Sequence, residues 1–324
     1  MRIRIATFNL ENLDHRPGQE PSLDKRIEAL RPALVRLDAD VLCLQEVNAQ
    51  GNKHRTLKAL EALLEDTPYA DFSRVATQSD TGKPLRDIQN LVTLSRFPIA
   101  AHEQFRHDLV SPPAYELATV ETPSKNSREI FWDRPVLYTR HSLGAADLHV
   151  VNVHFRAPIA AHIADKKTGA FEWTDAASWA EGFFVASLKR NAQALETRLV
   201  VERLFDEDAE ALIAVAGDFN SADREVPVAI LRADVEDTGN PELAGRVLIT
   251  LDNAIPEHTR HSVIHGGRRV MMDHILASRP LANSLERVKV HNELLEDELI
   301  AYLMGVHPAG SFHAPLVAEF TFPP

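Results

Sequence analysis

The sequence predicts an α/β fold in which two packed β-sheets are flanked by helices, a four-layer α/β/β/α sandwich. Strand-like segments rich in β-branched residues alternate with amphipathic helical segments along the chain. This alternation occurs twice, because each half of the chain begins with strand-like segments and continues with helical ones. The sequence contains no internal repeat, and no low-complexity tract or Gly/Ser-rich linker separates the halves. We therefore expect a single domain that spans residues 1–324.

The first half begins with a predicted strand at residues 2–10 (RIRIATFNL), where side chains alternate with a period of two. Residues 22–39 place apolar side chains on one helical face, with Ser22 as the candidate N-cap. Pro32 lies inside this helix and predicts a kink or a break. Residues 40–47 (DVLCLQEV) are nearly all apolar, as in a strand covered on both faces. The other elements expected in this half are a helix over 54–66 and strands over 90–99, 134–143 and 147–156.

The second half is dominated by a predicted long helix over residues 183–208. Before it, residues 157–182 predict an elaborated loop or insertion with some helix. That segment contains Lys166, Lys167 and two tryptophans, which either form a lip over the substrate or pack on one another. The other elements expected in this half are strands over 211–220, 269–278 and 314–322 and a short helix over 226–232.

The composition is that of a soluble globular protein with an acidic balance. The 324 residues carry a formal net charge of -12, and the sequence pI is about 5.7. This charge argues against tight non-specific nucleic-acid binding, which depends on clustered Lys and Arg, without excluding nucleic acid as a substrate. No apolar run approaches the ~20 residues that span a bilayer, and the N-terminus lacks the apolar core of a signal peptide. We therefore expect a cytoplasmic protein, with Cys43 as a buried structural thiol and no obligate protein partner.

Polar residues interrupt five apolar segments at or near their ends. The interruptions are FNLEN, LQEV, GDFNS, MMDHIL and SFHAP. An unpaired carboxylate in an apolar strand is unfavourable, so such groups are normally paired or bound to a metal ion. Several of them at strand ends indicate that they converge on one cleft.

Five of these residues form a set of oxygen ligands. Asn9 and Glu11 are two positions apart and so face the same side of a strand. Asp218 and Asn220 repeat this arrangement, and Glu46 follows a segment that should be buried. Carboxylate and amide oxygens suit Mg²⁺ or Mn²⁺ better than Zn²⁺. The sequence lacks the glycine-rich P-loop motif, which favours phosphoester hydrolysis over nucleotide-driven phosphoryl transfer.

In their order along the chain, the motifs TFNLEN, LCLQEV, VNVHF, AVAGDFNS, MMDHIL and SFHAP resemble those of the endonuclease/exonuclease/phosphatase superfamily. This superfamily includes DNase I-like nucleases, abasic-site endonucleases, sphingomyelinases and inositol-polyphosphate phosphatases. The resemblance extends from residue 7 to residue 317. It implies a DNase I-like sandwich of two mixed sheets, a divalent cation (Mg²⁺ or Mn²⁺) and a phosphoester substrate, which is either a nucleic acid or a small phosphoester.

The resemblance also implies roles for individual residues. Asp218 matches the aspartate that orients or deprotonates the attacking water, and Asn9 would position that aspartate. His313 matches the histidine near the phosphate, and Asp273 matches the carboxylate that holds this histidine. Asn220 matches a contact to phosphate or metal. A His–Asp pair of this kind fixes the tautomer of the imidazole and favours its cation.

Metal and substrate contacts complete the expected site. Glu46 matches the metal-ligand glutamate, and Glu11 would lie close to the metal, bound directly or through water. His154 matches a histidine that contacts the scissile phosphate. Arg134 is expected to reach the phosphate, since an arginine on a strand beside a phosphate cleft binds it well. Asn152, two residues before His154, either joins the site in binding substrate or merely shares the same face of the strand.

One position departs from the family pattern. The last motif is normally Ser-Asp-His, whereas here it is Ser311-Phe312-His313. The missing aspartate usually lies beside the metal, and phenylalanine cannot replace it as a ligand. Either Glu46 binds one metal alone and more weakly, or Glu11 takes over, or catalysis is impaired and the protein only binds its ligand. Because the other motif residues are present, we expect an active hydrolase with altered metal affinity.

Overall fold

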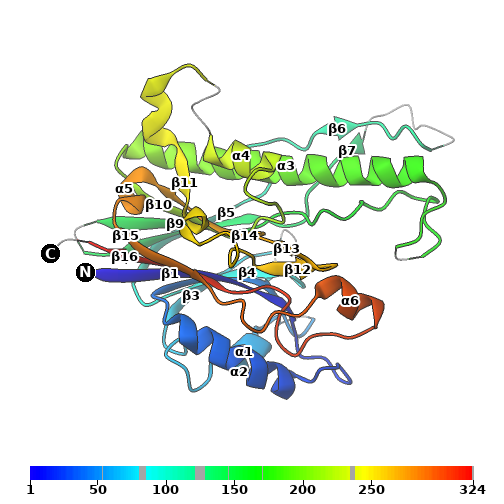
Figure 1. Cartoon of the computed structure of the whole chain (residues 1–324), viewed down its shortest axis with the longest axis horizontal. Helices are drawn as coiled ribbons and strands as arrows, with labels where there is room; N and C mark the ends of the chain where they lie inside the picture. The colour runs from blue at the N-terminus through cyan, green and yellow to red at the C-terminus, as the bar shows by residue number, and fades with distance from the viewer. Residues whose placement is uncertain are drawn as a thin grey trace.

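The structure is a computed structural model, and it describes every residue except 53, 80–84, 121–127, 145, 170, 234–237 and 323–324. Two six-stranded β-sheets pack face to face between two layers of helices (Figure 1). Helices α1 (Leu23–Leu37) and α2 (Lys58–Leu64) lie on one outer side, and the long helix α3 (Ala176–Glu207) crosses the other (Figure 1). This arrangement is the four-layer α/β/β/α sandwich that the sequence predicts.

The first sheet has the strand order β15-β16-β1-β2-β4-β3. Its strands are β1 (Arg2–Leu13), β2 (Val41–Val47), β3 (Ser73–Ala76), β4 (Asn90–Ser95), β15 (Leu285–Val290) and β16 (Leu316–Thr321). The neighbours β1 and β2 run parallel, whereas the other neighbouring pairs are antiparallel, so the sheet is mixed. Because β1 and β2 are parallel neighbours, their carboxyl ends lie side by side at one edge of the sheet.

The second sheet has the strand order β11-β14-β10-β9-β8-β5. Its strands are β5 (Ile99–Phe105), β8 (Val136–Ser142), β9 (Asp147–His154), β10 (Leu212–Asp218), β11 (Leu248–Thr250) and β14 (Asp273–Ser278). Here β9 and β10 are the parallel neighbours, and the remaining pairs are antiparallel. Two small two-stranded sheets are formed by β6 (Ala114–Tyr115) with β7 (Arg128–Glu129) and by β12 (Val263–His265) with β13 (Arg268–Val270).

Alternating side chains of the strands face different layers, as a period of two requires. Ile5 and Cys43 belong to the apolar core between the two sheets, whereas Phe8 packs in the core beneath α1 and α2. Cys43 is fully buried, which confirms the predicted structural thiol. A third core joins the second sheet to the helices on its outer side. The other helices in the described part of the chain are α4 (Val226–Arg232), α5 (Arg279–Ala282), α6 (Glu298–Leu303) and the 3₁₀ helices η2 (Pro241–Arg246) and η3 (Leu251–Ala254).

Helix α3 starts well before residue 183, where the sequence pattern predicts its beginning. Asp175 caps the helix by accepting a hydrogen bond from the backbone amide of Ser178 (2.7 Å). Gly182 lies within the helix, at a position that has no room for a side chain. A Cβ there would come within 2.6 Å of the carbonyl oxygen of Ala161. This tertiary contact explains why glycine, which has a low helix propensity, occurs inside α3.

The segment before α3 packs on itself. The Lys167 ammonium lies 5.0 Å from the centre of the Trp173 ring, and the two residues also form a backbone bridge. Of the two possibilities that the sequence leaves open for this segment, these contacts favour internal packing.

Several element boundaries differ from the predicted ones. The strand expected over 90–99 is two strands, β4 and β5, with Pro98 in the turn between them. The strand expected over 269–278 is likewise divided into β13 and β14. Pro32 does not divide α1, and Ser22 caps that helix as predicted. Strands β3, β6, β7, β11, β12 and β15 and helices α5 and α6 are not predicted from the sequence. Across the described part of the chain, no helix combines the length and the apolar character needed to cross a membrane.

Candidate active site

The strand register places three predicted residues in one row across the second sheet. Asp218 ends β10, and its Cα partners are His154, the last residue of β9, and Asp273, the first residue of β14. Asn9 of β1 and Glu46 of β2 belong to the first sheet. Asn9 joins the two groups, because its Nδ2 donates hydrogen bonds to Asp218 Oδ2 (3.0 Å) and to Glu46 Oε1 (3.2 Å). The site therefore lies where the two sheets meet.

Asp218 is buried, with 1% of its surface exposed, and hydrogen-bond donors surround its carboxylate. Its Oδ1 accepts from the backbone amide of Asn220 (2.8 Å). Its Oδ2 accepts from the side-chain amides of Asn220 (3.1 Å) and Asn9 (3.0 Å). Burial raises the pKa of Asp218 to about 7, while the positive charge of His313 opposes the rise and the charge of Asp273 adds to it. A carboxyl group with a pKa near neutrality is suited to accept a proton at physiological pH.

His313 forms a hydrogen-bonded pair with Asp273. Its Nδ1 lies 2.8 Å from Asp273 Oδ2, and its Nε2 lies 3.9 Å from Asp218 Oδ2. Burial lowers the pKa of His313, but the carboxylates of Asp273 and Asp218 outweigh burial and hold that pKa well above its usual value. Ser311 fixes the backbone here, because its hydroxyl donates to Asn9 O (2.8 Å) and accepts from His313 N (3.0 Å). The pair thus forms an imidazolium whose Nε2 faces the Asp218 carboxylate.

His154 is a neutral imidazole within the same site. Burial lowers its pKa well below the usual value, and the positive charges of Arg134 and His313 lower it further. Its Nε2 lies 3.3 Å from Asp218 Oδ2 and 3.6 Å from Glu46 Oε1. Because the ring is neutral, these are contacts of a neutral donor and not ion pairs. Its Nδ1 has no hydrogen-bond partner among the described residues.

Glu46 and Glu11, the predicted metal ligands, both have a left-handed backbone, with φ of 59° and 49°. Such a backbone is uncommon in residues other than glycine and concentrates at functional sites. Glu46 Oε2 accepts a hydrogen bond from the backbone amide of Asn12 (3.0 Å). Burial raises the pKa of Glu11, and the negative charge of Glu46 raises it further. A divalent cation would relieve this repulsion, so the pair fits the expected oxygen-ligand site.

A second group of potential ligand atoms lies nearby. Asp218, Asp273 and His313 each offer one ligand atom, and these atoms all lie within 4.8 Å of one another. The hydrogen bond between His313 and Asp273 accounts for part of this proximity. The carboxylates of Asp273 and Asp218 hold the pKa of His313 well above its usual value, and a protonated imidazole has no lone pair to offer a metal ion.

Arg134 lies near Glu46 and Asp218, whose charges act on it. Its Nη1 donates to the carbonyl oxygen of Phe155 (2.9 Å), and its Nε donates to Gln89 Oε1 (3.0 Å). Burial lowers the pKa of Arg134, while the nearby carboxylates of Glu46 and Asp218 raise it. The guanidinium therefore contributes positive charge beside the residues that would meet a phosphate.

Asn152 has a different place from the other predicted residues. Its Nδ2 donates to the carbonyl oxygens of Leu44 (3.3 Å) and Val92 (3.2 Å), and its Oδ1 accepts from Gln45 Nε2 (2.8 Å). All three partners belong to the first sheet, and Asn152 is fully buried. These contacts place Asn152 at the joining of the two sheets, and of the two alternatives that the sequence leaves open they favour the one without a role in substrate binding.

Tyr302 is part of the site, although no sequence motif indicates it. Its hydroxyl donates a hydrogen bond to Glu11 Oε1 (2.6 Å) across a separation of 291 residues. The ring of Phe312 is fully buried and meets the Tyr302 ring edge to face, with ring centroids 5.3 Å apart. Glu11 and Tyr302 line a pocket of about 460 Å³, together with Asn12 and Arg26. The unexpected Phe312 thus belongs to an aromatic contact with the residue that bonds to Glu11.

His274, next to Asp273 in the MMDHIL motif, forms hydrogen bonds that join segments next to the site. Its Nδ1 lies 3.0 Å from Asp252 Oδ2, and its Nε2 lies 2.8 Å from the carbonyl oxygen of Ser221. Burial lowers the pKa of His274, but the Asp252 carboxylate and these hydrogen bonds outweigh burial and raise it to about 9. The protonated ring therefore ties η3 to the loop that follows Asn220. No sequence motif predicts this role for His274, because its partner Asp252 lies 22 residues away.

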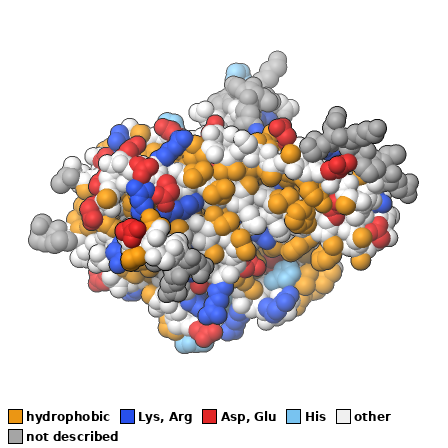
Figure 2. Space-filling model, turned by 90° about the horizontal axis from the view of Figure 1, so that it is seen from above, with side chains coloured by type: hydrophobic (Ala, Val, Ile, Leu, Met, Phe, Trp, Pro, Cys, Tyr) orange, Lys and Arg blue, Asp and Glu red, His pale blue; other side chains and the backbone are white. Residues whose placement is uncertain are grey.

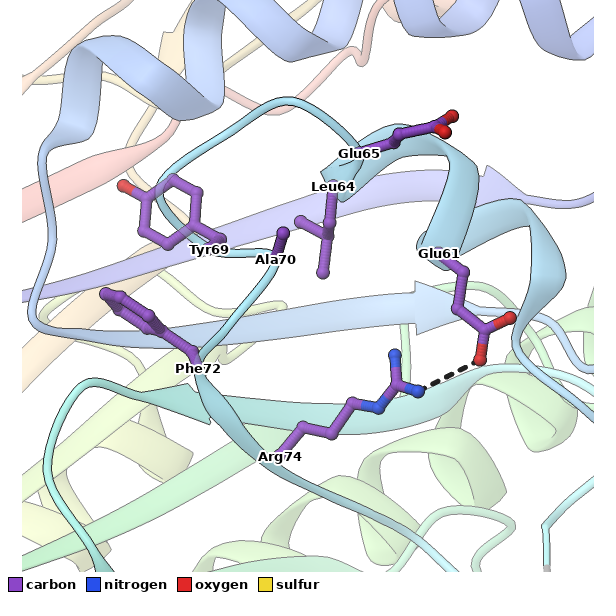
Figure 3. A pocket seen from close by; sticks show the side chains of 7 residues that line it. All are labelled: Glu61, Leu64, Glu65, Tyr69, Ala70, Phe72 and Arg74. Carbon is purple, nitrogen blue, oxygen red and sulfur yellow. Dashed lines mark hydrogen bonds and ion pairs between the residues drawn. The ribbon is translucent and has the colours of Figure 1, made fainter.

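A separate pocket of about 380 Å³ lies between α2 and β3 (Figure 3). Leu64, Tyr69 and Phe72 line it, and the ion pair between Arg74 and Glu61 (2.9 Å) lies along one side (Figure 3). It contains none of the residues that the sequence predicts for the site, so we do not assign the chemistry to it.

Solved structures with similar folds cover nearly the whole chain. Truncated TDP2 of Caenorhabditis elegans is 15% identical with a TM-score of 0.55, covering 99% of this chain and 98% of that chain. The 3′ phosphatase NExo from Neisseria, bound to a product DNA hairpin, is 17% identical with a TM-score of 0.53, covering 99% and 100%. An endonuclease/exonuclease/phosphatase from Bacteroides vulgatus is 15% identical with a TM-score of 0.55, covering 100% of both chains. These similarities confirm the DNase I-like fold.

Sequence comparison identifies the family. No curated protein matches the chain. The model of the Endonuclease/Exonuclease/phosphatase family, however, matches residues 6–292, which include every predicted site residue except His313. The motifs and the fold agree with this match, and the chain therefore belongs to the endonuclease/exonuclease/phosphatase family.

Proposed function

We propose that this protein hydrolyses phosphoesters with a divalent cation, Mg²⁺ or Mn²⁺, and that Asp218 activates the attacking water. The arrangement around Asp218 carries the proposal: a buried carboxylate oriented by two asparagines, with the His313–Asp273 pair beside it. Membership in a family of nucleases and phosphatases supports the same class of reaction.

In the proposed reaction, Asp218 accepts a proton from water as the water attacks phosphorus, and the bond between phosphorus and the ester oxygen breaks, so that the leaving group departs as an oxyanion that takes a proton from solvent. Asn9 and Asn220 hold the carboxylate in place, since both donate hydrogen bonds to its Oδ2. The pKa of about 7 leaves a substantial fraction of Asp218 ionised at neutral pH and keeps it basic enough to take the proton.

Three other side chains would meet the phosphoryl group. Protonated His313 donates through Nε2, while Asp273 holds Nδ1 and so fixes the orientation of the ring. His154 donates as a neutral imidazole, and Arg134 adds positive charge. Donors that are already oriented stabilise the charge that develops in the transition state.

Glu46 and Glu11 would hold the cation. When bound, the cation offsets negative charge on the phosphoryl oxygens and the leaving group. We assign it to this pair and not to Asp218, Asp273 and His313, because the latter three already interact as a base and a hydrogen-bonded donor pair.

The alternative of a protein that binds its ligand without turnover depends on Phe312. The residues proposed to carry the chemistry do not include position 312, and the ring of Phe312 packs against Tyr302. We therefore favour turnover.

The substrate is either a nucleic acid or a small phosphoester. The Neisseria structure of the same fold contains a DNA hairpin, which supports a nucleic acid. The net charge of -12 supports a small phosphoester, and on the face seen in Figure 2 Lys and Arg side chains lie among Asp and Glu.

The test is hydrolysis of bis-p-nitrophenyl phosphate with Mg²⁺ or Mn²⁺, with EDTA and the Asp218→Ala variant as controls. We expect EDTA to abolish activity and Asp218→Ala to reduce kcat by about 10²–10⁴-fold. Activity that survives both controls would refute the proposal. A panel of plasmid DNA, abasic-site DNA, RNA, phospholipids, nucleotides and sugar phosphates then identifies the substrate class.

A further inference from the structure

We propose that Tyr302 of α6 is a positioning residue that holds Glu11 for the divalent cation, and that Phe312 holds Tyr302 in turn. This inference rests on the proposed function, in which Glu11 and Glu46 hold the cation. The Tyr302 hydroxyl donates a hydrogen bond of 2.6 Å to Glu11 Oε1. The Tyr302 and Phe312 rings meet edge to face at an interplanar angle of 70°, and Phe312 is fully buried.

The backbone of Glu11 is fixed independently of its side chain. Its amide donates to Asn9 Oδ1 (2.9 Å), and its carbonyl oxygen accepts from Arg26 Nη1 (2.9 Å). Among the described residues, Tyr302 is the one that donates a hydrogen bond to the Glu11 carboxylate, through its hydroxyl. Loss of the Tyr302 hydroxyl would therefore release the carboxylate while the backbone stays in place.

Helix α6 is anchored firmly enough to position a side chain. Its capping residue, Asp297, accepts a hydrogen bond from the backbone amide of Ile300 (3.2 Å). The same carboxylate accepts from the amides of Gly266 (3.0 Å) and Gly267 (2.6 Å), in the turn between β12 and β13. Tyr302 thus extends from a helix that is tied to a neighbouring hairpin.

The chemistry of this contact suits a metal site. A neutral phenol orients a carboxylate without removing its charge, and it occupies Oε1 while leaving Oε2 for a cation. Without it, repulsion from Glu46 favours side-chain conformations that separate the two carboxylates. Ordering a flexible side chain before the cation binds strengthens binding, because the ordering is no longer required on association. In place of the aspartate expected at position 312, Phe312 provides the apolar ring against which Tyr302 packs.

The experiment is direct titration of the purified protein with Mn²⁺ by isothermal calorimetry, without substrate. We expect Tyr302→Phe and Phe312→Leu each to raise the Kd for Mn²⁺ by about tenfold with unchanged stoichiometry. Tyr115→Phe is the matched control, because it removes another tyrosine hydroxyl that donates to a glutamate, Glu181 Oε1 at 3.0 Å. Its Kd should stay within about twofold of wild type. Tyr302→Phe removes a single hydroxyl from a residue that is 44% exposed, so it tests the proposal even where Phe312→Leu does not fold.

Action through Glu11 has its own test. Glu11→Gln weakens Mn²⁺ binding by itself, and adding Tyr302→Phe to it should cause no further loss. An unchanged Kd in Tyr302→Phe, or fully additive losses in the double variant, would overturn the positioning role while leaving the proposed hydrolase intact. A wild-type protein that takes up no Mn²⁺ would overturn both.

Discussion

At the scale of the residue, Asp218 is buried and His313 is partly buried, and the two differ in protonation. Burial raises the pKa of Asp218 to about 7, whereas carboxylates raise the pKa of His313 well above its usual value in spite of burial. Between these two pKa values, the aspartate is an anion and the histidine is a cation. Water attack on a phosphoester needs this combination of a base and a charged donor.

We expect kcat/KM to rise with pH until Asp218 is ionised and to fall at alkaline pH as His313 loses its proton. The acidic limb should lie at or below about pH 7, because a bound cation favours the carboxylate. The measurement is a pH–rate profile on bis-p-nitrophenyl phosphate at saturating Mn²⁺. His313→Gln should remove the alkaline limb and keep the acidic one. If its alkaline limb is unchanged, the assignment of His313 is wrong.

At the scale of the element, Gly217 sets how closely β10 and β9 approach. A Cβ at this position would lie 1.9 Å from the carbonyl oxygen of Val153. The next residue, Asp218, is in register with His154. The close approach of the two parallel strands therefore depends on the missing side chain.

Gly217→Ala should destabilise the protein by at least ~2 kcal/mol, because the clash is with backbone and cannot be relieved by a rotamer change. Any folded variant should also have reduced kcat, since separating the strands moves Asp218 relative to His154. Urea unfolding and kcat measure the two effects. Gly245→Ala, where a Cβ meets nothing within 4 Å, is the control and should behave like wild type. Equal stability of the two variants would contradict this account.

His274 links β14 to η3 and to the loop after β10 through Asp252 and Ser221. Its pKa in the folded protein is raised to about 9, whereas an unfolded histidine titrates near ~6.5. The folded state therefore binds this proton more tightly. Its contribution to stability is fully present below about pH 6.5 and is lost as pH rises toward 9.

His274→Gln should lower the free energy of unfolding most at about pH 6, by a few kcal/mol, and progressively less toward pH 9. Urea unfolding of the metal-free protein at several pH values tests this, and the wild-type minus variant difference isolates His274 from other titrating groups. His258→Gln, at an exposed position, should have the same free energy of unfolding as the wild type at every pH. A difference that is constant with pH would show that His274 acts without its charge.

At the scale of the whole molecule, two features matter. The site is built from residues of both sheets, and the molecule carries a negative net charge. Asn9 of the first sheet holds Asp218 of the second, and Asn152 of the second sheet bonds to three residues of the first. The site thus forms only when the two sheets have packed. The molecule that carries it is acidic overall, with a net charge of -12.

We expect weak, strongly salt-dependent binding to undamaged duplex DNA, with a Kd weaker than about 10 μM at physiological salt. The reason is that the net charge of -12 opposes association with a polyanion. Fluorescence anisotropy with a labelled duplex and a metal-free Asp218→Ala variant measures binding without cleavage. Nanomolar affinity would point instead to a local basic surface that recognises nucleic acid.

The sequence by itself determined the order of the layers and most of the residues that the structure brings together in the candidate site. Asn9, Glu46 and Asp218 could be identified because each is a polar residue at the end of an apolar strand, where burial requires a partner. The four-layer fold followed from the alternation of strand and helix patterns, since each pattern defines an apolar face that must be covered. These features depend on short segments of the chain, so they can be recognised in a single sequence without a structure.

The tertiary structure decided what depends on distant parts of the chain. It placed Asn152 between the sheets, paired His274 with Asp252, and brought Tyr302 to Glu11 across 291 residues. Phe312, expected as a missing ligand, proved to pack edge to face against the ring of Tyr302. Such contacts follow from how sheets and helices pack, and the periodicity of a short segment contains no information about them.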